Sequence, residues 1–560
     1  MADNSRSNNS GLIGGELLVT VIFYLLGIGI LLPWNAFISA KPYFESRLCD
    51  PNDPSSGNGD GGDVESWFGL VFNLASVCSL GFIIIVNWYR DRHPSTNNTN
   101  LSELQSEITG DGIISEGGEP DAPLMRIQGG ESARTSSSLD GFWMVILPLS
   151  VYLVVFLLTT IIVLIPDLAP DRFLNWTLIL LALCGISCSI AGAGIIATAG
   201  AFDPRIGISS YFSGQAVGGV AVSVANFIAQ VLHDPTDFWA QECPSSVEGR
   251  FLDDTENENI QEQQCTPYKG ADWNTFVYFS LGCFVLALCI IGYIYIQHSN
   301  AADRLHQQGH SALQTDADDD MPIEEQDGSN IEIFSDDDTS PRQTYQGGST
   351  NREVFEVTGP EDDIVLVQEE NFDTVSIYKA VSGPVWSIWL TLFVTLTIFP
   401  TWTSRLESIH KCQNHVRLQN DLYVALTFVI FNLGDLTGRL LSNKVDVASI
   451  GDLSKKLVLI ALARLLFGPI FFLCTARDSA FQEVVIHSDI FSILLQYCFG
   501  ITNGMLLSLS FMHAPSLLPS NASVQGIAST IMNFSLVLGL LCGSFFSFGY
   551  VQLGTGHINL

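Results

Sequence analysis

Charged residues are scarce in this chain. Asp, Glu, Lys and Arg make up 15% of its 560 residues, while hydrophobic residues make up 47%. A soluble domain carries roughly 25% charged residues, so a water-soluble globular fold is excluded for much of the chain. Basic residues are especially few. The 24 Lys and Arg stand against 58 Asp and Glu, which gives a net charge of −34.

Sequence signatures of catalysis and metal binding are missing as well. The chain has no His-Glu-x-x-His motif, no Gly-x-Ser-x-Gly elbow and no Walker phosphate-binding loop. Its cysteines and histidines do not show the spacing of zinc ligands. The first apolar run lacks a small-residue cleavage site, so a cleaved signal peptide is not expected. We therefore predict that the protein is not an enzyme and holds no cofactor and no metal.

What the chain has instead is a series of long apolar runs. A helix needs about 20 such residues to cross a bilayer. The predicted fold class is therefore an all-α polytopic membrane protein with eleven transmembrane helices. These runs cover about 17–39, 66–88, 141–165, 174–200, 206–231, 273–297, 380–402, 421–441, 456–475, 489–512 and 524–549.

The spacing of the runs divides the chain six plus five. A long segment rich in Asp and Glu follows the sixth run, and we expect it to be disordered because it has too little apolar surface to bury. The division favours two helix bundles around a central path, as in transporters built from halves. Lys and Arg near the span ends favour a cytoplasmic N-terminus. The expected layout begins with a cytoplasmic N-terminus (1–16) and a six-helix bundle (17–297), which includes a cytoplasmic loop (89–140) and an outside loop (232–272). An acidic cytoplasmic loop (298–379) follows. The chain then continues with a five-helix bundle (380–550) and an outside tail (551–560).

A proline interrupts the first run near its end. Pro33 frees the carbonyl group one turn back and kinks a helix, and Trp34 and Asn35 follow it directly. Two interpretations are open: a bent helix that lines a polar cavity, or a tolerated kink with an interfacial Trp and a helix-end Asn. The seventh run ends in a second proline bend, Phe399-Pro400, at a similar predicted depth.

The eighth run carries a charged pair. Asp435 and Arg439 are four residues apart and share one helix face, on which Asn432 also lies. Charges at membrane depth are costly and typical of a substrate or ion path. The alternatives are an ion pair that locks two helices together, or an Arg439 side chain that reaches the cytoplasmic surface.

Other polar or small residues in the runs are less specific. Gly214 and Gly218 in the fifth run form a small-xxx-small face typical of close helix packing. Gln215 lies between them, and two roles are open for it: helix packing or lining the substrate path. Arg464 lies within the ninth run. In the predicted outside loops, a disulfide between Cys243 and Cys265 is one candidate, although pairing does not follow from sequence.

Taken together, these motifs resemble the equilibrative nucleoside transporter family (solute carrier family 29). They appear in the family's order over nearly all eleven runs. The matching segments are Gly-x-Gly-x-Leu-Leu-Pro-Trp-Asn at 27–35, Ser-Gly-Gln at 213–215, Phe-Pro at 399–400, Phe-Asn-x-x-Asp-x-x-Gly-Arg at 431–439 and Asn-Gly at 503–504.

The resemblance implies a fold similar to the major facilitator architecture and passive passage of nucleosides, with nucleobases as further substrates, by alternating access. It implies that Leu31 and Trp34 flank the nucleoside and that Asp435 and Arg439 engage the ribose or gate the path. The same resemblance adds further residues to the cavity wall. These are Phe399, Phe428 and Asn432. The residues themselves, and not the resemblance, make Asn35 and Gln215 further candidates for the path, and Asn35 is also expected to hold the bend at Pro33.

One position departs from the family pattern. Many members carry a fourth-span Gln that hydrogen-bonds the base, and this chain has Ala193 there. Base recognition is therefore expected to be weaker, rearranged or directed at another substrate.

Other functions stay open at this point. They are proton-coupled nucleoside transport in an acidic organelle, a carrier for another small polar or cationic solute, and a membrane scaffold. We expect a monomer that contacts the lipid bilayer and no nucleic acid. The plasma membrane is favoured over the vacuolar or lysosomal membrane.

Overall fold

The fold is almost entirely helical, which confirms the predicted all-α membrane class. A computed structural model describes residues 2–40, 43–44, 47, 64–92, 142–165, 169–232, 239, 243, 273–299, 373–413, 415–445, 450–477, 479–480, 486–519 and 521–556. Within these residues the only β-pairing is an isolated bridge between Leu406 and Ala476. Most of the predicted loops at 89–140, 232–272 and 298–379 lies outside the described residues.

The first half of the chain contributes six of the predicted spans. They are α1 (Ala2–Ser39), α3 (Val64–Arg92), the π-helix η3 (Phe142–Ile146) continued by α6 (Leu147–Val163), α7 (Pro170–Gly200), α8 (Ile208–Leu232) and α10 (Trp273–His298). The second half begins with the short α12 (Thr374–Ala380). It continues with α13 (Ser382–Ile398), η5 (Thr403–Arg405), η6 (Arg417–Gln419), α14 (Tyr423–Ser442), α15 (Leu453–Ala463), η7 (Arg464–Leu466), α16 (Phe467–Phe471), α17 (Asp489–His513), η8 (Ala514–Leu517) and α18 (Ala522–Thr555).

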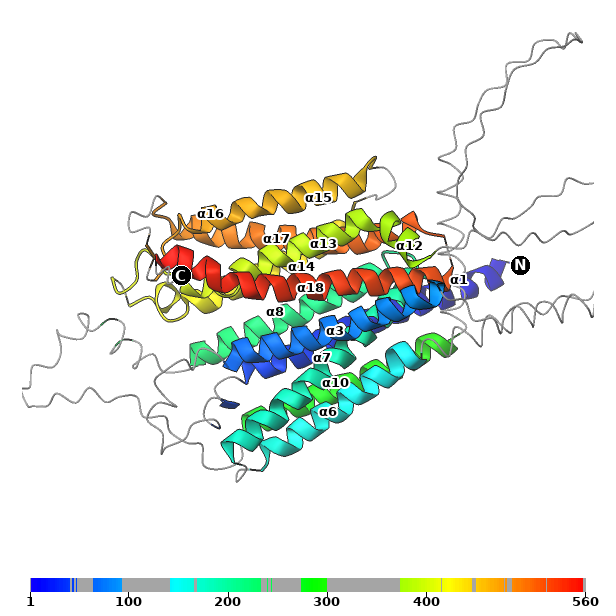
Figure 1. Ribbon diagram of the computed structural model, residues 1–560, viewed down its shortest axis with the longest axis horizontal. Coiled ribbons are helices and arrows are strands. Elements are labelled where there is room, and N and C mark those ends of the chain that lie inside the picture. The colour runs from blue at the N-terminus through cyan, green and yellow to red at the C-terminus, as the bar shows by residue number, and fades with distance from the viewer. Residues whose placement is uncertain are drawn as a thin grey trace, which may run out of the picture.

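Among the described helices, ten are long and apolar enough to cross a membrane. The ninth predicted run is not one of these ten. It forms α15, the 3₁₀ turn η7 and α16, which follow one another along the bundle beside α17 (Figure 1). Pro469 in α16 has no N–H for the carbonyl group of Leu465, so a regular helix is weakened at this turn. The predicted count of eleven is therefore not reached by unbroken helices.

The helices form two groups that follow the chain order (Figure 1). Helices α1, α3, α6, α7, α8 and α10 pack on one another, and α13, α14, α15, α17 and α18 form the second group. We call them the N-half and the C-half. They meet where α8 packs along α14 and α17, and where α3 and α7 pack on α18. The N-terminal end of α1 and the C-terminal end of α18 lie at opposite ends of the bundle (Figure 1).

Glycine faces bring the central helices unusually close. A methyl group on Gly214 of α8 would clash with the carbonyl oxygen of Tyr24 in α1, whereas one on Gly218 would only make ordinary contact with Ile28. Between α14 and α17, a methyl group on Gly438 would clash with the carbonyl oxygen of Ile501. Small residues allow such contact in membrane bundles, so these helices pack almost backbone to backbone.

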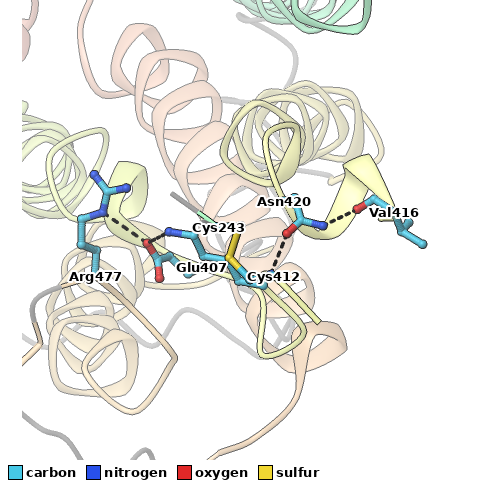
Figure 2. The surroundings of a disulfide bond; sticks show 7 residues. Cys243, Glu407, Cys412, Val416, Asn420 and Arg477 are labelled. Carbon is cyan, nitrogen blue, oxygen red and sulfur yellow. Dashed lines mark hydrogen bonds and ion pairs between the residues drawn. A yellow bond between two sulfur atoms is a disulfide. The ribbon is translucent and has the colours of Figure 1, made fainter. Parts of the chain in front are cut away.

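A disulfide joins the two halves. Cys243, which follows α8, is bonded to Cys412, which follows α13, with a Cα–Cα distance of 5.4 Å (Figure 2). The predicted Cys243–Cys265 pairing is therefore wrong, because a cysteine forms one disulfide and Cys243 uses its own with Cys412. Cys265 lies outside the described residues. Sequence spacing favoured the nearer partner, whereas the fold places a cysteine 169 residues away beside Cys243.

Candidate functional site

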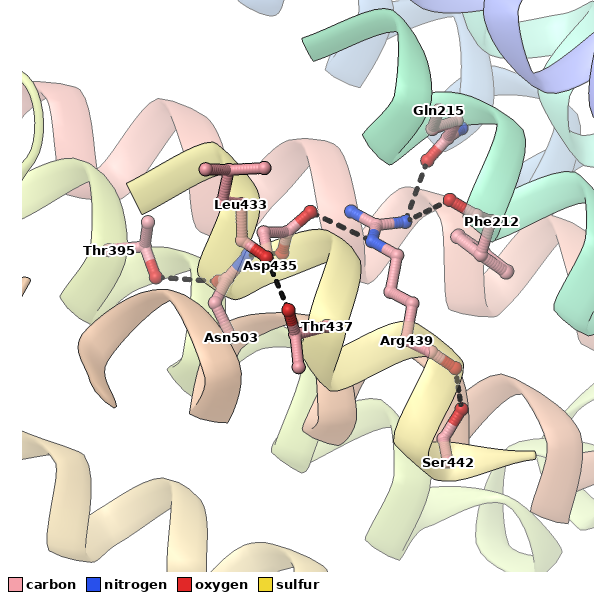
Figure 3. A network of polar contacts seen from close by, with 9 residues as sticks. All are labelled: Phe212, Gln215, Thr395, Leu433, Asp435, Thr437, Arg439, Ser442 and Asn503. Atoms are coloured by element: carbon pink, nitrogen blue, oxygen red, sulfur yellow. Dashed lines mark hydrogen bonds and ion pairs between the residues drawn. The ribbon is translucent and has the colours of Figure 1, made fainter. Parts of the chain in front are cut away.

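The charged pair of α14 is buried where the halves meet. Asp435 is 6% exposed and Arg439 is 7% exposed. The Arg439 Nε donates to Asp435 Oδ2 at 2.9 Å (Figure 3). One turn of helix separates the two residues, so the pair is set by the local sequence. The desolvation of both groups is offset only where further hydrogen bonds satisfy them, and both groups have such bonds.

Helix α17 supplies the second bond to Asp435. The Asn503 Nδ2 donates to Asp435 Oδ1 at 2.6 Å, and the Asn503 Oδ1 accepts from Thr395 Oγ1 of α13 at 2.8 Å. The close approach of the helices makes this contact reachable, because a methyl group on Gly504 would clash with the carbonyl oxygen of Asp435. The carboxylate is therefore held from two sides.

Arg439 reaches from the C-half to the N-half. Its Nη1 donates to the carbonyl oxygen of Phe212 at 2.9 Å and to Gln215 Oε1 at 3.4 Å, both in α8 (Figure 3). Asn432 lies on the same side of α14. Its Nδ2 donates to the Phe428 carbonyl at 2.9 Å, and its Oδ1 would lie 2.6 Å from a Cβ on Gly219 of α8. Arg439, Gln215 and Asn432 thus all lie at the α8–α14 contact.

An aromatic cluster lies beside this contact within the C-half. The ring of Phe399 is stacked on Phe431 at a centroid distance of 4.1 Å and lies 4.8 Å from Phe428. Phe399 is the C-cap residue directly after α13, and the peptide bond to Pro400 is cis. Phe399 and Phe428 are both partly exposed. They present ring surface next to the polar residues of α14.

The first-run residues lie in the N-half. Helix α1 continues through Pro33, so the backbone is helical on both sides of it, and the Pro33 side chain lies outside the described residues. Leu31 and Trp34 are partly buried, and the ring of Trp34 packs on Phe72 of α3 at 4.7 Å. The Nδ2 of Asn35 is buried without a hydrogen-bond partner. None of the described contacts joins Trp34 to Asp435.

Ala193 of α7 lies among apolar side chains. It is fully buried in a small hydrophobic cluster with Leu80 of α3 and Val537 of α18. A side chain that could hydrogen-bond a base is therefore absent from this position, as the sequence indicates.

Sequence reasoning missed three members of the polar network. Thr395 and Asn503 connect to Asp435 as described above, and Arg464 of η7 donates to Thr395 Oγ1 at 2.8 Å. In the sequence, Asn503 is recognised only as part of a family motif, and no sequence pattern indicated a role for Thr395. Arg464 did carry one, since an arginine within an apolar run points to a buried polar partner.

In chemical terms, the described residues offer hydrogen-bond acceptors and donors beside aromatic surface. Asp435 accepts, Arg439 donates, and Gln215 and Asn432 can do either. Such a set of groups is chemically suited to an uncharged polar solute. Among the described residues, no three His, Cys, Asp or Glu side chains gather as a metal site would require.

The fold and this buried network define a polytopic helical membrane protein with a polar contact between two helix bundles. The family model for nucleoside transporters matches residues 265–552, more than half of the chain. The protein belongs to the nucleoside transporter family.

Relatives resemble the chain along nearly its whole length. Equilibrative nucleoside transporter 3 of Rattus norvegicus is 23% identical over 94% of this chain and 86% of its own length. Equilibrative nucleoside transporter 2 of Mus musculus is 24% identical over 96% of this chain and 97% of its own length. Among solved structures, the proton:xylose symporter XylE of the major facilitator superfamily aligns at 12% identity with a TM-score of 0.44, over 96% of this chain and 88% of that chain.

Proposed function

We propose that this chain carries nucleosides passively across a membrane, in both directions, by alternating access between the N-half and the C-half. The observation that carries the proposal is the buried Asp435–Arg439 pair at the contact between the halves. Membership of the nucleoside transporter family supports the substrate class.

The chemistry of a nucleoside fits this network. A nucleoside is uncharged, with a flat aromatic base and a sugar edge rich in hydroxyl groups. Asp435 accepts hydrogen bonds from the ribose hydroxyls and Arg439 donates to them, while Trp34, Leu31 and Phe399 supply apolar surface for the base. A site with a few such contacts binds in roughly the micromolar-to-millimolar range, which allows fast release on the far side.

The bonds of Arg439 suggest how the path opens. Its bond to Asp435 lies within one helix, whereas its bonds to Phe212 and Gln215 cross to the other half. When the halves move apart, only the crossing bonds break, and substrate hydroxyl groups can replace them. The C-half therefore keeps its carboxylate in place through the transport cycle.

The finer placement follows the sequence pattern. We propose a cytoplasmic N-terminus, with the disulfide on the outside, and a monomer in the plasma membrane that binds nucleosides or nucleobases and no nucleic acid. Charge near the span ends supports the orientation, since Lys and Arg favour the cytoplasmic side.

The direct test is uptake of labelled uridine and adenosine into proteoliposomes that hold the purified full chain. We expect saturable uptake by the wild type without an imposed ion gradient. Asp435→Asn and Trp34→Ala should each lower uptake at least about tenfold, the effect of losing roughly 1.4 kcal/mol of substrate binding.

Matched variants away from the path serve as controls. Asp452→Asn changes an exposed carboxylate, and Trp386→Ala removes an indole that is 52% exposed on α13; both should keep wild-type uptake. Absence of uptake by the wild type would contradict the function, whereas normal uptake by both path variants would contradict only the assigned site.

A further inference from the structure

Arg464 is the most deeply buried arginine side chain among the described residues, at 1% exposure. It lies in η7, the 3₁₀ turn that interrupts the ninth span. A guanidinium group at membrane depth is costly and is kept where it serves a polar path or a partner. The proposed contacts to the nucleoside do not involve it.

The guanidinium group is bound on three sides by the C-half. Its Nη1 donates to the carbonyl oxygen of Phe499 at 3.0 Å and to the hydroxyl group of Thr502, both in α17. Its Nη2 donates to Thr395 Oγ1 of α13 at 2.8 Å. The cation also lies 4.5 Å from the centre of the Phe499 ring, a favourable cation–π distance.

A continuous chain of hydrogen bonds leads from this cation to the carboxylate. Arginine can only donate, so Thr395 accepts from Arg464 with its oxygen, which leaves its single hydrogen for another acceptor. Asn503 Oδ1 lies 2.8 Å away and the carbonyl oxygen of Thr391 lies 2.7 Å away. When the Thr395 hydroxyl group donates to Asn503 Oδ1, the Asn503 Nδ2 continues the chain by donating to Asp435 at 2.6 Å.

All bonds in this chain then have the same direction. Each donor is polarised by the one before it, and aligned hydrogen bonds in a low-dielectric interior strengthen one another. The Asp435 carboxylate can only accept, so the Nδ2 of Asn503 faces it, and the Thr395 hydroxyl group, by donating to the Oδ1, holds the amide in the same orientation.

The charges in the network are also unequal. It contains two guanidinium groups, Arg439 and Arg464, and one carboxylate, Asp435. Within the part of the chain that the structure describes, the ion pair in this network is Arg439 with Asp435. Arg464 is therefore linked to Asp435 through the neutral side chains of Thr395 and Asn503 and not by a direct ion pair.

We propose that Arg464 is a positioning residue for substrate recognition: acting through Thr395 and Asn503, it holds the Asp435 carboxylate in the orientation that accepts the ribose hydroxyls. The proposal rests on the proposed function. The proposal assigns a role to the ninth span. Its helix α15 packs on α13 and α17 of the C-half.

A purely structural role for Arg464 has a different consequence. If the residue only ties η7 to α17, its loss lowers the amount of folded protein and slows transport of every substrate in parallel. If it positions Asp435, its loss weakens recognition of the ribose hydroxyls in particular. The preference for uridine over 2′,3′-dideoxyuridine, which lacks those hydroxyls, separates the two roles.

The experiment measures KM and maximal rate for both nucleosides in proteoliposomes. Because Arg464→Met also removes the bonds to α17 and can prevent folding, Thr395→Val is the deciding variant. It removes the hydroxyl relay and leaves the Arg464 bonds to Phe499 and Thr502 in place. We expect the uridine KM to rise about three- to tenfold, as for a weakened hydrogen bond to a charged group, with the dideoxyuridine KM unchanged.

The matched control is Thr397→Val, two residues further along α13. Among the described residues, the Thr397 hydroxyl group bonds only the Phe393 carbonyl oxygen of its own helix, at 2.7 Å, so this variant should keep the wild-type preference. Arg464→Lys keeps the cation and, where it folds, should retain more of the preference than Thr395→Val.

Two results would overturn the proposal. An unchanged preference in Thr395→Val, together with a lost preference in Asp435→Asn, would remove the role of Arg464 and leave the proposed function intact. An unchanged preference in Asp435→Asn would show that this carboxylate does not contact the ribose, and the inference would fall with that site assignment.

Discussion

At the scale of single residues, buried amides in this protein differ in whether they are paired. Asn503 is satisfied at both ends by Asp435 and Thr395. Asn35, next to the proline of the first span, has a buried Nδ2 without a partner. A buried donor left unpaired costs about 1–3 kcal/mol. The chain tolerates this cost at Asn35, and the unpaired donor fits the prediction that Asn35 belongs to the substrate path.

We therefore expect Asn35→Leu to separate stability from function. The variant should raise the free energy of unfolding by about 1 kcal/mol, because it removes an unsatisfied donor, and it should lower uridine uptake. Thermal unfolding in detergent and uptake in proteoliposomes measure the two effects. Asn503→Leu is the comparison and should lower both quantities. Full uptake by Asn35→Leu would place this amide outside the substrate path.

At the scale of the helices, the α14–α17 contact depends on glycine. Gly434 and Gly438 of α14 face α17, and Gly500 and Gly504 of α17 face α14. At each of these positions an added methyl group would lie too close to the backbone of the other helix. Backbone atoms cannot move aside as a flexible side chain can. The bond between Asn503 and Asp435 exists only because the two helices approach this closely.

Gly438→Ala should therefore damage both the fold and the site. Overpacking of this kind costs about 1–3 kcal/mol, so we expect a lower melting temperature and lower uptake. Gly526→Ala in α18 is the matched control, because nothing lies within 4 Å of its added methyl group. Alanine favours a helix over glycine by up to about 1 kcal/mol, so this control should be as stable as the wild type or more so. Equal melting temperatures for Gly438→Ala and the wild type would contradict the close packing.

At the scale of the whole molecule, the two halves are tied together at one end of the bundle. The Cys243–Cys412 disulfide connects them (Figure 2). Nearby, Arg417 donates to the carbonyl oxygens of Gln230 and Val231, each at 2.7 Å. These carbonyl groups belong to the last turn of α8, where backbone acceptors have no partner within the helix. At this end of the α8–α14 contact, the halves are therefore joined by a disulfide and by hydrogen bonds from a charged side chain.

The disulfide predicts how the chain behaves when it is cut between the halves. Proteolysis at a site engineered into the acidic segment, residues 298–379, should give two fragments that stay together on a non-reducing gel and separate after reduction. Cys412→Ser should release the fragments without reduction, whereas Cys265→Ser should not. Release of the wild-type fragments without reduction would contradict the Cys243–Cys412 bond.

Much of the fold could be predicted because its signals are local. A run of bilayer length is visible in the sequence itself, and the runs correspond to α1, α3, α6 with η3, α7, α8, α10, α13, α14, α17 and α18. The interruption of the ninth run at Arg464–Leu466 was not predicted, although Pro469 supplies a local cause. The expected orientation and the residues of the substrate path stay predictions.

The sequence by itself determined the membrane class, the place of the spans, the order of the family motifs and the Asp435–Arg439 pair. Each of these depends on residues within one helix or one run. Only the tertiary structure decided that Cys243 pairs with Cys412 and that Arg464 connects to Asp435 through Thr395 and Asn503. These contacts join residues tens to more than a hundred positions apart. The packing of helices against one another decides such contacts, and hydrophobic periodicity and spacing along the chain carry no information about it.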